Sequence, residues 1–225
     1  MIPEDYQKKL NEFEKCFPNF ISKVPYIYDV DIDKKIKFTS EEHLNNMLIN
    51  NINTNYGTFE ESKGFSWNLF ELEAFSYFWE EESLWLTNLL EDMEKFCQYI
   101  SAIEISLWIY YFQHSFISWH TNSDMPGISL LFSWSKEGDG YFKSYNPKTE
   151  NFEIYKDDVG WNVKGLHIPT AEESLTLGTN WHCVETTSPR YTIGFFIRKP
   201  EVKKDFCEEI LEEFQLKRTP NGNWI

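Results

Sequence analysis

Two of the five histidines in this sequence stand directly after a tryptophan, at the ends of predicted strands. His120 lies in the segment WHTNSD, and His182 lies in the segment NWHC. A metal ion accepts neutral imidazole nitrogens together with an oxygen ligand. The two histidines are therefore candidate metal ligands, provided that their strands are neighbours whose inner faces meet in one barrel.

The oxygen ligand of such a site is expected just after His120. Asn122 follows two residues later, and side chains two residues apart share one face of an extended strand. Asp124, one further step along, reaches the same face if the strand continues. An amide oxygen carries no charge and binds a metal cation more weakly than a carboxylate does. The sequence therefore leaves three possibilities open, in which Asn122, Asp124 or neither residue is the third ligand.

A candidate anion-binding pair lies in the segment RYTIGFFIR. Arg190 and Thr192 are two residues apart, so a strand presents both on one face. A guanidinium bonds both oxygens of a carboxylate, and a neighbouring hydroxyl adds a further donor. An unpaired cation inside a barrel is costly, so we expect an acidic ligand to bind there. Arg198, on the same predicted face, is the alternative clamp.

The elements that must position these residues begin near residue 103, where the hydrophobic period changes to two. Gly, Pro and Asp clusters separate the resulting segments from one another. About seven short strands at near-regular spacing predict a sandwich or a jelly-roll barrel. The predicted strands are 106–112, 127–135, 140–146, 151–157, 160–168, 180–186 and 190–198.

The flanks of this β-rich region have helical periodicity. The clearest case is Leu69–Ile100, which is expected to form one helix or two helices broken near Glu80–Ser83. We therefore predict a single domain over residues 1–225. Its parts are a mostly helical support region over 1–100, a β core over 101–200 and a C-terminal helix over 201–217.

Composition excludes several functions. With 21 Lys and Arg against 36 Asp and Glu, the net charge of −15 repels phosphate and anionic membranes, so neither nucleic acid nor membrane is an expected partner. No apolar run reaches the roughly 18 residues of a membrane span. The charged start predicts no secretory signal, and four scattered cysteines are typical of reduced thiols, so the expected location is cytoplasmic. P-loop, GxSxG and GxGxxG motifs are absent.

The order in which these candidate residues follow one another along the chain is also informative. In chain order they are His120, Asn122, the segment Gly138–Phe142, His182, Arg190 and Thr192. This order resembles the iron(II)- and 2-oxoglutarate-dependent oxygenases, and in particular their small phage and bacterial prolyl-hydroxylase-like members. The resemblance covers residues 103–198. It implies a double-stranded β-helix, which is a cupin-like jelly roll, as the core of a mainly β fold with flanking helices.

The resemblance also implies cofactors and roles. Iron(II) would bind His120, His182 and one oxygen ligand, while Arg190 and Thr192 would hold the distal carboxylate of 2-oxoglutarate. With O₂, the expected reaction is hydroxylation of a small molecule or of a peptide or protein side chain. Trp119, Trp134, Trp161 and Trp181 are expected to wall the pocket.

One departure keeps other functions open, because the family normally has Asp or Glu where this chain has Asn122. A non-catalytic jelly-roll module that binds a metal or a ligand is the alternative. A halogenase-like variant, with a halide in place of the protein oxygen ligand, is the third. The sequence determines neither the substrate nor the oligomeric state.

Overall fold

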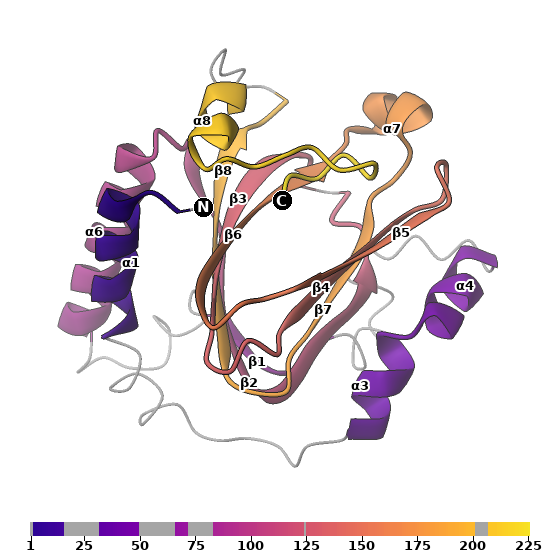
Figure 1. The fold of residues 1–225 in the computed structure, drawn as a ribbon, viewed down its shortest axis with the longest axis horizontal. Helices are drawn as coiled ribbons and strands as arrows, with labels where there is room; N and C mark the ends of the chain where they lie inside the picture. Colours follow the sequence, from indigo (N-terminus) through magenta and orange to yellow (C-terminus); the bar gives the residue numbers. More distant parts are fainter. Residues whose placement is uncertain (1, 16–31, 50–65, 72–82, 124, 201–206) are drawn as a thin grey trace.

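The computed structural model describes residues 2–15, 32–49, 66–71, 83–123, 125–200 and 207–225. Strands dominate the second half of the chain, and helices flank them (Figure 1). The elements are α1 (Glu4–Glu14), α3 (Ile32–Phe38), α4 (Glu41–Ile49), β1 (Ser66–Glu71), α6 (Ser83–Tyr99), β2 (Glu104–His120), β3 (Gly127–Ser135), β4 (Tyr141–Asn146), β5 (Asn151–Lys156), β6 (Gly160–Ile168), α7 (Ala171–Leu177), β7 (Trp181–Glu185), β8 (Arg190–Arg198) and α8 (Cys207–Glu213).

The strands form one curled antiparallel sheet in the order β5-β4-β7-β2-β8-β3-β6, with β1 added along β2. The long strand β2 belongs to both halves of this sheet. Its first part, from Glu104 to Tyr111, pairs with β8, and its last part, from Phe116 to His120, pairs with β7. The sheet therefore folds over on itself as a double-stranded β-helix, which confirms the predicted fold class of a mainly β jelly roll with flanking helices.

Side chains that alternate along the strands fill the space between the two halves of the sheet. The apolar ones form a single inner cluster, and their neighbours in sequence point outward. The members of the inner cluster are Ile109, Tyr111, Ile117, Leu131, Phe142, Leu166, Ile168 and Val184. This arrangement explains the period of two that the sequence shows from residue 103 onward.

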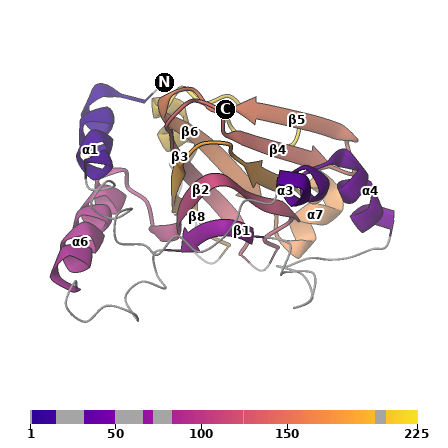
Figure 2. The ribbon, with the colours of Figure 1, turned by 90° about the horizontal axis from the view of Figure 1, so that it is seen from below.

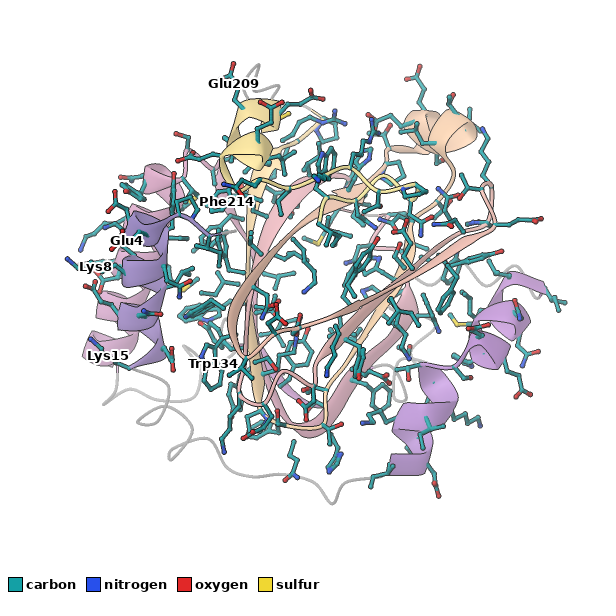
Figure 3. The ribbon with its side chains drawn as sticks, in the orientation of Figure 1. Glu4, Lys8, Lys15, Trp134, Glu209 and Phe214 are labelled. Carbon is teal, nitrogen blue, oxygen red and sulfur yellow. The ribbon has the colours of Figure 1, made fainter. Side chains whose placement is uncertain are left out.

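Helices cover the outer faces of the sheet. The helices α1 and α6 lie together against β3 and β8, where Leu10 and Phe96 pack with Phe132 and Phe195 (Figures 1 and 2). Figure 3 shows the charged side chains of α1 pointing away from the barrel, while Phe214, after α8, lies against it. Fully burying one such aromatic or aliphatic side chain stabilises the fold by about 1.5–3 kcal/mol.

On the other outer face, Leu44 and Met47 of α4 pack against Trp119 and Trp181. The prediction that tryptophans wall the inner pocket is therefore wrong for both residues. Each directly precedes a histidine that points inward, and consecutive strand residues point to opposite faces. Trp134 and Trp161 likewise pack against the outer cluster that α1 and α6 cover.

Some predicted helices differ from the observed elements. Residues 69–71, expected to begin a helix, belong to β1, which pairs with β2. Residues 72–82 lie outside the described part of the chain, and α6 begins at Ser83. Within the helix predicted over 201–217, α8 covers Cys207–Glu213, and 201–206 lie outside the described residues. A short apolar run in a sequence is compatible with a helix and with a strand. Residues 69–71 belong to a strand because they pair with β2 in the folded protein, and the sequence alone does not show that pairing.

The C-terminal segment after α8 returns to the sheet. The residue Trp224 pairs with Gly165 of β6, and the amides of Asn221 and Asn223 both donate to the buried Ser144 hydroxyl of β4. These bonds tie the end of the chain to strands of both halves of the sheet. Among the described helices, none combines the length and the apolarity that a bilayer span requires.

Candidate metal centre

A one-residue bulge in β2 brings the two predicted imidazoles together. Ile117 is the Cα partner of Val184, and His120 is the Cα partner of His182, so three steps along β2 match two steps along β7. The extra residue reverses which face the next side chains take. Ile117 and His120 therefore both point inward, and the rings of His120 and His182 lie 4.2 Å apart between centroids.

Backbone carbonyls fix the tautomers of both rings. Nδ1 of His120 lies 2.7 Å from the carbonyl oxygen of Ser118, and Nδ1 of His182 lies 3.1 Å from that of Asn180. A carbonyl oxygen can only accept, so each Nδ1 carries the proton and each Nε2 carries the lone pair. Burial, followed by the charge of His120, holds the pKa of His182 well below its usual range. Neutral imidazoles with Nε2 lone pairs are the form that a metal binds.

Asn122 completes this arrangement, although not in the way expected. The strand β2 ends at His120, and Asn122 has a φ of 48°, so it is not on an extended strand. Asparagine tolerates this left-handed conformation better than most residues. Its Nδ2 lies 3.3 Å from Nε2 of His182, while its buried Oδ1 has no hydrogen-bond partner among the described residues. A half-turn of the amide exchanges these two atoms and directs the oxygen toward the imidazoles.

Among the described residues, the atoms available to ligate a metal here are therefore Nε2 of His120, Nε2 of His182 and, after that half-turn, Oδ1 of Asn122. Asp124, the other predicted oxygen ligand, lies outside the described residues. Within the described part of the chain, no group of three or more His, Cys, Asp or Glu side chains is placed to hold a metal ion. The residues present fit a metal with two imidazole ligands, with Asn122 Oδ1 as an uncharged third donor.

These side chains line a cavity of about 360 Å³ between the two halves of the sheet. That volume lies within the range of about 300–1,000 Å³ for small-molecule sites. Most of the wall is apolar. The polar lining residues are Glu104, Ser106, His120, Asn122, Ser133, Lys164, His182, Arg190 and Thr192.

Arg190 is in this cavity wall, and Thr192 is next to its guanidinium. Nη1 of Arg190 donates to Thr192 Oγ1 over 2.5 Å, and Nη2 donates to Ser133 Oγ over 2.8 Å. The guanidinium also lies 5.1 Å from the centre of the Tyr111 ring. The predicted pair thus shares one cavity with the two imidazoles, whereas Arg198 pairs with Glu173 and does not line it.

The sequence reasoning missed the counter-ion of this arginine. Asp157 Oδ2 accepts from Nε of Arg190 over 2.7 Å, and Asp157 Oδ1 accepts from Nζ of Lys164 over 2.5 Å. The expectation of an unpaired Arg190 cation is therefore wrong. Asp157 is only 1 % exposed, and its place in an Asp-Asp pair made it look like a turn residue. A lysine in the middle of an apolar strand, as in NVKGL, was the signal that could have revealed the pair.

Electrostatics favours the charged forms of Asp157 and Arg190 in this cluster. Burial alone would raise the pKa of Asp157, but Arg190 and then Lys164 outweigh it and lower the value to about 2. The pKa of Lys164 is lowered, chiefly by burial and also by the charge of Arg190, although Asp157 opposes both effects. Gly140 makes the close approach possible, because a Cβ there would lie 2.4 Å from Asp157 Oδ2 and 3.0 Å from Arg190 Nε. This glycine is one of the residues in the segment Gly138–Phe142.

Comparison with known proteins gives only distant likenesses. No protein-family model matches the sequence, and no curated protein matches it. A dioxygenase for auxin oxidation in rice matches with a TM-score of 0.35 and 13 % identity, over 89 % of this chain and 71 % of that chain. A prolyl-4-hydroxylase from Pseudomonas putida gives 0.31 and 12 %, over 53 % of this chain and 66 % of that chain.

A cupin domain of CENP-C from Drosophila melanogaster gives a TM-score of 0.27 and 8 % identity, over 41 % of this chain and 59 % of that chain. The matched part of this chain thus spans about three fifths of that domain. Likenesses at such low scores carry no argument about the fold or the function of this chain.

Proposed function

We propose that this chain is a non-haem iron(II) oxygenase that uses 2-oxoglutarate as its cosubstrate. The observation that carries the proposal is that two imidazoles, with ring centroids 4.2 Å apart, and a buried guanidinium line one cavity. His120 and His182 would hold iron(II), with Asn122 Oδ1 as a weak third ligand. With 2-oxoglutarate and O₂, bound iron supplies the oxidising power to break an unactivated C–H bond.

The contribution of the protein is placement and exclusion of water. The Nδ1 bonds to Ser118 and Asn180 orient the two rings and leave each Nε2 unprotonated, which is the form that ligates a metal. Arg190 and Thr192 would bind the distal carboxylate of 2-oxoglutarate, which fixes the direction of the keto-acid end. The apolar wall, including Leu131 and Phe142, keeps the remaining space dry for the part of the substrate that reacts.

The proposed outcome is hydroxylation of a small molecule or of a peptide or protein side chain. In the balanced reaction, 2-oxoglutarate and O₂ yield succinate and CO₂, and the second oxygen atom enters the substrate as a hydroxyl group. The net charge of −15 favours a neutral or basic substrate over a nucleic acid.

The test is production of succinate from 2-oxoglutarate by purified protein supplied with iron(II), ascorbate and air. We expect succinate with the wild type, and none with His182→Ala or with zinc in place of iron. A wild type that binds both iron and 2-oxoglutarate, yet yields no succinate with a broad panel of candidate substrates, contradicts the proposal.

A second candidate function is a non-catalytic metal- or ligand-binding module, and Asn122 is the observation that favours it. An uncharged amide gives iron less electron density than a carboxylate does. If Asn122→Asp produces succinate and the wild type does not, the chain is a binding module on an oxygenase-like site. Chloride-dependent products would instead indicate the halogenase-like variant.

A further inference from the structure

Two cations, and not one, face the cavity near Thr192. Both Arg190 and Lys164 line the cavity, whereas Asp157, which contacts both, is not among its lining residues. The carboxylate therefore lies behind the two cations, where it is 1 % exposed. Its two oxygens are each used by one of them, Oδ2 by Arg190 and Oδ1 by Lys164.

The formal charge of this cluster is positive by one unit, from two cations and one carboxylate. The described carboxylate that does line the cavity, Glu104, is too distant to neutralise it. Glu104 pairs with Phe196, six residues along β8 from Arg190, which is a separation of about 20 Å on an extended strand. Glu104 also has its own partner in Lys199.

We propose that Lys164 is a specificity-determining residue of this cavity, binding a ligand carboxylate together with Arg190. The ligand class is an organic acid that presents one carboxylate to the pair. For the natural ligand, this inference rests on the proposed function, where that carboxylate is the distal one of 2-oxoglutarate. Binding of the carboxylate itself needs no metal.

The geometry explains why a second cation is needed. Arg190 already donates through Nε, Nη1 and Nη2 to Asp157, Thr192 and Ser133, so much of its donor capacity is used within the protein. An ammonium has three donors, and Asp157 takes one from Lys164. Within the described part of the chain, Lys164 therefore brings both the net charge and unused donors. Asp157 holds the two cations side by side despite their repulsion.

The experiment measures binding of glutarate to the full chain without metal, in the presence of a chelator, by isothermal titration calorimetry. We expect Lys164→Met to weaken glutarate binding by about tenfold or more, because a charge-assisted bond is lost. Lys143→Met is the matched control. That lysine is also mostly buried and paired, with Glu185, but it does not line the cavity, so its removal should leave the affinity unchanged.

Equal glutarate affinity in Lys164→Met and the wild type overturns the inference, as does a wild type that does not bind glutarate at all. If Lys164→Met fails to fold, Lys164→Gln carries the same test, since its amide can still donate to Asp157 without a charge. Failure of the proposed function is a separate result. A chain that binds glutarate through Lys164 but yields no succinate with iron keeps the carboxylate site and loses the oxygenase.

Discussion

His120 and His182 are Cα partners across β2 and β7, and their ring centroids lie 4.2 Å apart. The reason is a bulge: the stretch of β2 from Ile117 to His120 has one residue more than the stretch of β7 that pairs with it. The bulge turns His120 inward and leaves Trp119 on the outer face, packed beneath α4. Nδ1 of each ring donates to the carbonyl of the residue two positions earlier. Local backbone geometry thus sets the orientation and the tautomer of both imidazoles.

The first prediction concerns the two imidazoles as a pair. His120→Ala and His182→Ala should each lower the affinity for iron(II) or manganese(II) by at least about tenfold, since loss of a metal contact is costly. Metal titration by calorimetry under anaerobic conditions measures this. His167→Gln is the control, because His167 lies outside the cavity, and it should bind metal as the wild type does. Unchanged metal binding in either alanine variant would exclude a shared site.

The second prediction concerns Asn122. Replacing it with Asp should tighten metal binding by about tenfold, because a charged oxygen replaces a neutral one near the cation. Asn122→Ala should weaken binding, as it removes the buried Oδ1, which no other side chain or backbone group in the described part of the chain hydrogen-bonds. The same titration compares the three proteins. An alanine variant with wild-type affinity would show that Asn122 does not ligate.

The third prediction compares two arginines of β8. Arg190→Met should weaken 2-oxoglutarate binding by about tenfold to a hundredfold, the worth of charge-assisted hydrogen bonds. Arg198→Met makes the same change on the same strand, at a residue that pairs with Glu173 instead of lining the cavity. It should leave 2-oxoglutarate binding unchanged. Equal losses in the two variants would mean that Arg190 acts only through general stability.

The fourth prediction concerns Gly140. A Cβ at this position would collide with Asp157 and crowd Arg190, so Gly140→Ala should cost about 2–3 kcal/mol of unfolding free energy and weaken glutarate binding. Gly160→Ala is the comparison. There a Cβ meets no atom within 4 Å, and only a φ of 88° opposes it. That variant should cost about 1 kcal/mol and leave glutarate binding intact.

The fifth prediction concerns pH and His167. Burial, followed by the charges of Arg198 and Arg218 against that of Glu173, lowers the pKa of His167 to about 4. The unfolded chain then binds a proton near pH 6.5, before the folded chain does. Stability from this group is complete above pH 6.5 and falls by about 3 kcal/mol as the pH drops to 4.

Urea unfolding at pH 7.5 and pH 4.5 tests this dependence. His167→Gln cannot be protonated, so its unfolding free energy should fall less than that of the wild type between the two pH values. Identical losses in the two proteins would place the acid sensitivity elsewhere.

The sequence by itself determined the fold class and which chemically active side chains the strands carry. Two Trp-His pairs, an Arg-x-Thr pair and a period of two from residue 103 pointed to imidazoles and a guanidinium on the strands of a jelly roll. These features are local, because the side-chain types and the alternation of apolar and polar residues can be read from neighbouring positions in the sequence. For the same reason the sequence could place Arg190 and Thr192 on one face without any tertiary information.

Only the tertiary structure decided which faces and which partners meet. The bulge before His120 reverses the alternation, and strict spacing from Ile117 would have turned that ring outward. The cluster of Asp157, Lys164 and Arg190 joins three segments whose contacts depend on strand order, and Gly140 admits it by lacking a side chain. Register and pairing between distant strands arise from packing of the whole sheet, so no local pattern encodes them.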